Sequence, residues 1–134
     1  MKRFLPLVIT LALGQALQAQ KMRDVFAAMP DSVLGIMTKN NRLDCIDFIE
    51  NTMAAKVHNR FDGDTELKAL TVDYLELQLT KNCRVEMKLL PSEDTLYYIC
   101  VARTYSGPMA ETKVALYTPD WETLPEEKWM SRPV

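Results

Sequence analysis

The chain has 134 residues, with 16 basic and 18 acidic side chains and a formal net charge of −2. This slightly acidic balance disfavours a nucleic-acid partner, because such partners require a basic surface. The length suits one domain with its own core and leaves no room for two full-sized ones. Three cysteines are far too few for a disulfide-stapled scaffold.

The first residues have the pattern of a secretory signal peptide. Lys2 and Arg3 precede an apolar run over residues 4–13, and small and polar residues follow over 14–19. The apolar run is about half of the ~20 residues that a membrane-spanning helix needs, and no second run follows. The sequence therefore predicts a cleaved signal at residues 1–19 and no transmembrane anchor.

Cleavage is expected between Ala19 and Gln20, with a site after Ala16 as the alternative. Removing residues 1–19 takes away two of the 16 basic residues and no acidic one, which leaves 14 against 18 and a net charge of −4. The mature chain, residues 20–134, is therefore expected to work as a single domain in the periplasm or outside the cell.

The beginning of the mature chain predicts two or three helices. Apolar residues recur with the spacing of one helical face over 22–29, Pro30 ends this helix, and a short helical turn follows at 33–37. Asn41 is the predicted N-cap of the next helix, with Asp44 in the third position of a capping box. The predicted buried stripe of this helix is Ile46, Ile49 and Met53, and its acidic outer face is Asp44, Asp47 and Glu50.

After Ala55 the apolar period changes from helical to two, which is typical of strands with one wet face. The expected fold is α+β, with two or three N-terminal helices packed on one face of an antiparallel meander sheet of about five or six strands. A polar tail is expected from about residue 119. The predicted strands cover residues 56–61, 65–70, 72–80, 84–90, 95–104 and 113–118.

The alternation of apolar residues also predicts strand register. A two-residue turn between the third and fourth strands would set Leu77 opposite Glu86, so that apolar rows meet charged ones. A slip of one residue exchanges the faces of a strand. We therefore expect the three-residue loop 81–83, which pairs Leu77 with Met87.

The same register places the cysteines. Cys83 becomes a loop residue, and Cys100 lies on the core face opposite Val85. Cys83 and Cys100 are then diagonal neighbours, close to the upper limit of separation for a bridge, and form the candidate disulfide. The alternative is that these two cysteines and Cys45 are buried free thiols.

The sequence carries no recognisable catalytic motif, so we predict no catalytic, cofactor-binding or metal-binding residue. His58 is the only histidine and lies in a predicted edge hairpin, where a surface role is expected. Asp62, Asp64 and Glu66 surround Gly63, but their spacing does not match a calcium loop, so a solvated turn is the better interpretation.

Two tryptophans near the C-terminus are the candidate interaction surface. Trp121 and Trp129 flank an acidic, proline-containing segment over residues 122–127. Exposed aromatic rings serve as platforms in protein and sugar recognition. The alternative is that these rings close the end of the core.

Several segments together resemble a known family. The run from Asn41 to Phe48, Asn-Arg-Leu-Asp-Cys-Ile-Asp-Phe, is the most specific of them, and Met87-Lys88-Leu89-Leu90-Pro91 and Asp120-Trp121 add to it. They resemble a family of small exported proteins from the Bacteroidales lineage that is known only as a domain of unknown function. The resemblance implies a periplasmic or secreted location and supplies no mechanism.

Three functional hypotheses follow from these observations. The first is a non-enzymatic binding or accessory domain that recognises a protein or a component of the cell envelope. The second is a small hydrolase that uses carboxylates such as Asp44 or Asp47, which requires paired carboxylates in a cleft. The third is a structural subunit of an envelope assembly, which requires a large apolar patch.

Overall fold

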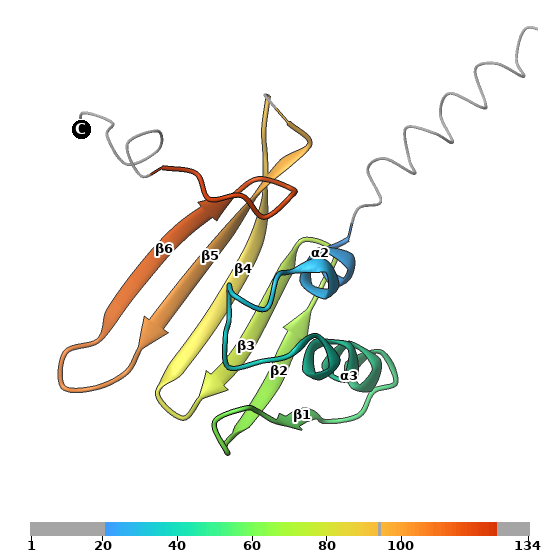
Figure 1. Cartoon of the computed structure of the whole chain (residues 1–134), viewed down its shortest axis with the longest axis vertical. Helices are drawn as coiled ribbons and strands as arrows, with labels where there is room; N and C mark the ends of the chain where they lie inside the picture. The colour runs from blue at the N-terminus through green and yellow to red at the C-terminus, as the bar shows by residue number, and fades with distance from the viewer. Residues whose placement is uncertain (1–20, 94, 126–134) are drawn as a thin grey trace, which may run out of the picture.

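A computed structural model describes residues 21–93 and 95–125, so the predicted signal peptide lies outside the described residues. The fold is α+β, with two helices preceding six strands (Figure 1). The elements are α2 (Met22–Ala28), α3 (Lys39–Glu50), β1 (Ala55–His58), β2 (Asp64–Leu70), β3 (Tyr74–Thr80), β4 (Cys83–Pro91), β5 (Tyr97–Tyr105) and β6 (Glu111–Tyr117).

The six strands form one antiparallel sheet in which the spatial order equals the chain order, β1-β2-β3-β4-β5-β6. The predicted antiparallel meander is therefore confirmed. Helix α3 packs against β1 and β2, while β5 and β6 extend away from both helices (Figure 1). Beyond β6, Tyr117 is bridged to Thr123, because the chain turns back at the end of that strand.

Helix α2 forms where the apolar spacing predicts it, with Met22, Val25 and Phe26 buried. The segment after it differs from the prediction, because residues 31–36 form turns instead of a helical element. Leu34 in this linker is nonetheless buried, so the apolar residues there serve the core without helical geometry.

The N-cap of helix α3 lies three residues before the predicted one. Thr38 is the cap: its Oγ1 accepts a hydrogen bond from the Asn41 amide at 3.1 Å, and Asn41 Oδ1 accepts one from the Thr38 amide at 3.0 Å. The prediction of Asn41 as N-cap is wrong because Asn41 occupies the third position of the capping box. The predicted stripe also fails at Met53, which lies beyond α3 and is 58% exposed, whereas Arg42 is buried.

In the β3–β4 hairpin the apolar side chains lie on one face, as predicted, but the pairing of the two strands differs from the prediction. Leu77 lies opposite Val85, two residues from the expected partner Met87. The connection is a two-residue turn, with Thr80 opposite Cys83, and a register irregularity between Gln78 and Thr80 restores the alternation. A shift of two residues keeps each side chain on its face, so the apolar rows still meet.

The β4–β5 register differs by an odd number of residues, and this exchanges the faces of β5. Lys88 lies opposite Cys100, and Met87 lies opposite Val101. Cys100 was predicted opposite Val85 on the core face; that prediction is wrong, since Ile99 and Val101 are the buried residues and Cys100 is only half-buried.

The candidate disulfide between Cys83 and Cys100 is not formed, because all three cysteines are free. Cys83 is a buried strand residue opposite Tyr105, and Tyr105 is five residues along β5 from Cys100. At about 3.3 Å per residue this separation is roughly 16 Å, far beyond the reach of a disulfide. Burial raises the pKa of the Cys83 and Cys100 thiols and raises that of Cys45 to about 11, which disfavours the reactive thiolate.

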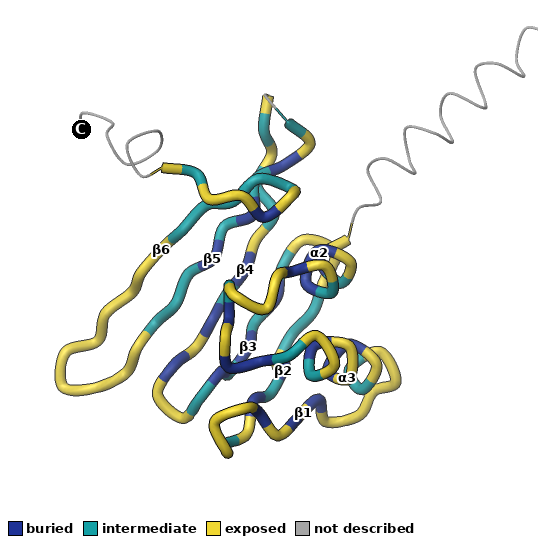
Figure 2. Tube along the Cα trace, in the orientation of Figure 1, coloured by how far each residue is buried: buried dark blue, intermediate teal, exposed yellow. Residues whose placement is uncertain are grey.

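One core cluster joins the helices, the linker and the buried row of the sheet (Figure 2). Strand β3 shows the alternation most clearly, with its three leucines buried and the residues between them half-buried. Strand β6 contributes no buried residue. Neither α2 nor α3, the helices of the described residues, is long and apolar enough to cross a membrane.

Candidate functional site

Trp121, half of the predicted interaction surface, is a core residue. Its side chain is 8% exposed, its Nε1 donates a hydrogen bond to the Val25 carbonyl at 3.1 Å, and its ring centroid lies 5.1 Å from that of Tyr117. The prediction of an exposed platform is therefore wrong for Trp121, and the alternative that it closes the core is confirmed. Trp129 and the predicted cleavage site Ala19-Gln20 lie outside the described residues.

The carboxylates of the hydrolase hypothesis do not gather in a cleft. Asp44 and Asp47 are exposed on α3, as the predicted acidic face requires. Neither of them lines the three cavities of about 330, 350 and 470 Å³ that lie among the described residues. No group of three or more metal-ligating side chains occurs within residues 21–93 and 95–125.

A groove lies around Phe61, at the end of the sheet where the β1–β2 loop meets the linker. Two cavities of about 350 and 470 Å³ share the lining residues Ile36, Phe61 and Thr80. We call them together the Phe61 groove. The first cavity is also lined by Leu34, Gly35, Leu79, Asn82, Cys83, Arg103 and Tyr105, and the second by Asn59, Gly63, Asp64 and Lys81.

The buried side chain of Asn59 holds the loop that presents Phe61. Its Oδ1 accepts hydrogen bonds from the amides of Phe61 and Gly63 at 2.9 and 3.1 Å, and its Nδ2 donates to Thr65 Oγ1 at 3.0 Å. Thr65 Oγ1 in turn donates to the Leu79 carbonyl at 2.7 Å. The loop is thus tied to the sheet, while the ring of Phe61 is left 74% exposed at its tip.

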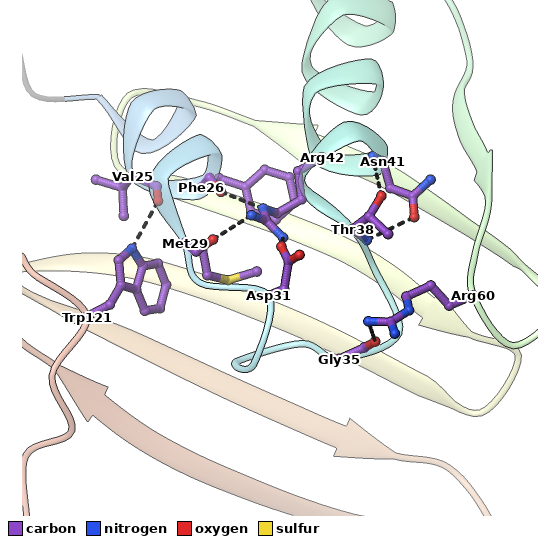
Figure 3. Close-up of polar contacts among 10 residues, drawn as sticks. All are labelled: Val25, Phe26, Met29, Asp31, Gly35, Thr38, Asn41, Arg42, Arg60 and Trp121. Carbon is purple, nitrogen blue, oxygen red and sulfur yellow. Dashed lines mark hydrogen bonds and ion pairs between the residues drawn. The ribbon is translucent and has the colours of Figure 1, made fainter.

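The linker forms the opposite wall of the groove and is held by two arginines. The Arg60 amide donates to the Ile36 carbonyl at 3.0 Å, and Arg60 Nη1 donates to the Gly35 carbonyl at 3.3 Å (Figure 3). Arg103 Nη2, from β5, donates to the Val33 carbonyl. These contacts fix the linker against both the β1–β2 loop and the sheet.

The beginning of the linker is anchored by Arg42, whose side chain is 1% exposed. Its guanidinium donates to the carbonyls of Phe26 and Met29 at 3.1 and 2.5 Å and pairs with Asp31 at 2.9 Å (Figure 3). One side chain of α3 thereby satisfies the end of α2 and the first turn of the linker. The wall of the Phe61 groove therefore depends on a buried cation remote from it.

The groove is bordered by positive charge. Arg103 lines the first cavity and Lys81 the second, and neither makes an ion pair among the described residues. The one acidic lining residue, Asp64, lies 3.6 Å from His58 Nδ1. The lining is otherwise apolar or neutral, a combination that favours binding of an apolar group next to a negative charge.

His58, which lies beside the groove, should make the stability of the fold depend on pH. A hydrogen bond to Asp62, at 2.9 Å, and a weaker contact with Asp64 raise the pKa of His58 above its usual 6.5. Because the folded-state pKa is raised, this stabilisation is present below about pH 6.5 and is lost as the pH rises through the folded-state value. NMR titration of the imidazole should show the raised pKa.

Replacement of Asp62 by Asn should return the His58 pKa toward 6.5, and Asp64→Asn should lower it less, because the hydrogen bond to Asp62 is the larger cause. A pKa that stays unchanged in both variants would show that the two carboxylates do not act on the imidazole.

Sequence reasoning missed the groove because none of its walls is continuous in the chain. The one local signal is Phe61 itself, a large apolar residue beside Asp62-Gly63, where a polar turn residue is usual. The structure gives Asp62 a positive φ of 64°, which confirms a sharp turn there.

Comparison with known proteins agrees with the resemblance drawn from the sequence. Residues 14–134 match the family described as Protein of unknown function (DUF3256). No curated protein matches the chain. A solved structure, described as a domain of an uncharacterized protein from Porphyromonas gingivalis W83, is similar with a TM-score of 0.69 and 26% identity.

That similarity covers 86% of this chain and 59% of the solved one, so the chain spans less than two thirds of its length. The predicted membership of a family known only as a domain of unknown function is confirmed. With a match over residues 14–134, the chain belongs to the DUF3256 family.

Proposed function

We propose that this protein is a non-enzymatic binding domain that holds an extended segment of a partner protein in the Phe61 groove. The observation that carries the proposal is that Phe61 is 74% exposed and lines two cavities. A buried hydrogen-bond network fixes the loop that carries this ring, which reduces the entropy cost of binding at its tip. Exposed aromatic rings on rigid supports are frequent anchors in protein interfaces.

We also infer that the two helices lie over the same face of the sheet. Buried residues of α2 and α3 belong to the same core cluster as Leu77 of β3 and Val101 of β5. Side chains of the other row, such as Lys88, are solvent-exposed. The Phe61 groove then opens at the border of the covered face, where a partner can reach it.

Export to the periplasm is part of the proposal and is supported by the charged, apolar and small-residue order of residues 1–19. Cell fractionation tests it. The full chain should appear in the periplasm with residues 1–19 removed, and a variant without those residues should stay in the cytoplasm. A full chain that stays uncleaved in the cytoplasm would overturn this part.

Site-specific photocrosslinking tests the groove. With benzoylphenylalanine in place of Phe61, the protein should give one dominant adduct in an envelope extract of its own host, identified by mass spectrometry. Met109 is the matched control, because it is 89% exposed and lines none of the three cavities. The same probe at position 109 should give no such adduct.

A native-chain variant provides the second readout. The Phe61→Ser variant should no longer bind the partner that crosslinking identifies. Its unfolding transition should be almost unchanged, because the Phe61 ring is already exposed to water in the free protein. Equal crosslinking from positions 61 and 109, or full capture by Phe61→Ser, would overturn the proposed site.

A further inference from the structure

We propose that acidic and apolar residues alternate along the segment bound in the Phe61 groove, and that its carboxylates pair with Arg103 and Lys81. The inference deepens the proposed function and rests on it. It specifies the chemical class of the partner segment, which neither the family nor the similar structure indicates.

The first support is the uncompensated charge of the groove. The guanidinium group of Arg103 donates to the neutral carbonyl of Val33, and no carboxylate pairs with it among the described residues. Lys81, which lines the second cavity, likewise has no ion-pair partner there. Two cations without an ion-pair partner, Arg103 and Lys81, thus line one groove in a chain whose net charge is −2.

The only acid in the lining does not cancel this charge. Asp64 is a single carboxylate against the two lining cations Arg103 and Lys81, and it lies 3.6 Å from His58 Nδ1. An incoming carboxylate would instead find the free N–H groups of Arg103 and Lys81. Hydrogen bonds between such cations and carboxylates are roughly twice as strong as neutral ones.

The second support is the shape and lining of the groove. Leu34 and Leu79 provide apolar walls in the first cavity, and Ile36 and Phe61 line both cavities. Side chains at alternate positions of an extended segment face the same way, so two apolar residues of one segment can flank the ring. Both cavities are open to solvent, whereas a pocket for a lipid or small ligand encloses most of its occupant.

Three synthetic peptides of equal length serve as probes: leucine alternating with glutamate, with glutamine, and with lysine. Binding to the full chain is measured by fluorescence anisotropy at low and at high salt. The glutamate peptide should bind at least about tenfold more tightly than the lysine peptide, and this preference should shrink at high salt.

Two charge-removing variants connect the preference to the groove. Arg103→Gln should weaken binding of the glutamate peptide by about tenfold more than binding of the glutamine peptide, which loses only the support that Arg103 gives to the linker. Because Arg103 also holds the linker, Lys81→Gln is the second variant; Lys81 makes no hydrogen bond to another side chain among the described residues and should show the same pattern. The control Arg23→Gln, an exposed cation outside the groove, should bind all three peptides as the parent does.

The outcomes separate this inference from the proposed function. Equal binding of the three peptides, or tighter binding of the lysine peptide, would overturn the acidic specificity. If no peptide binds but crosslinking at position 61 still gives its adduct, the inference fails and the binding site stands. If neither is observed, both fail.

Discussion

Replacing Arg42 by alanine is expected to lower the free energy of unfolding by about 3–5 kcal/mol. The guanidinium satisfies the carbonyls of Phe26 and Met29 and pairs with Asp31, and its side chain is 1% exposed. Alanine removes all three interactions and leaves two carbonyls without their donors in a low-dielectric environment. Urea denaturation followed by circular dichroism measures the loss.

The matched control is Arg23, another arginine of the helical region that also pairs with acids. Its ion pair with Glu50 spans 2.5 Å, but both side chains are 42% exposed, so Arg23→Ala should cost less than about 1 kcal/mol. Arg42→Lys should also be destabilising, because a single ammonium group cannot replace the planar fork that reaches three acceptors. Equal small losses for Arg42→Ala and Arg23→Ala would show that the buried contacts of Arg42 do not hold the helices together.

Replacing Trp121 by alanine is expected to cost about 3–5 kcal/mol, the usual range for a large buried aromatic residue. The indole fills the space beside Tyr117 and donates to the Val25 carbonyl, so it joins the end of the sheet to α2. Trp121→Phe keeps most of the packing and removes the donor, and it should cost about 1–3 kcal/mol. Thermal and urea unfolding of the two variants measures the loss of stability from the whole indole and from its hydrogen bond alone.

A surface residue calibrates this experiment. Leu96 is 61% exposed, and Leu96→Ala should change stability by less than about 0.5 kcal/mol. If Trp121→Ala were as mild as Leu96→Ala, the indole would be dispensable to the core. The platform interpretation of Trp121 would then regain support.

The type and order of the elements were predictable because they depend on local periodicity. The alternation of Leu75, Leu77 and Leu79 identifies a half-buried strand without knowledge of its neighbours. Helix α2 followed likewise from one apolar face. The start of α3 did not, because Thr38 and Asn41 are both good caps and only their reciprocal hydrogen bonds decide between them.

The strand registers and the Phe61 groove could not be predicted from the sequence, because each depends on long-range geometry. A bulge beside Leu79 permits the two-residue turn that apolar pairing alone excludes. The face of Cys100 depends on how many residues the β4–β5 connection absorbs, and one odd shift reverses it. The Phe61 groove needs the linker and the sheet to converge, which no local pattern encodes.

The indole hydrogen bond between Trp121 and Val25 joins residues 96 positions apart, whereas every strand of the sheet pairs with its neighbour in the chain. Short-range pairings close small loops and form early, while this contact closes almost the whole described chain. We therefore expect a folding transition state in which the hairpins are formed and α2 is undocked. Substitutions at Trp121 should accelerate unfolding much more than they slow folding.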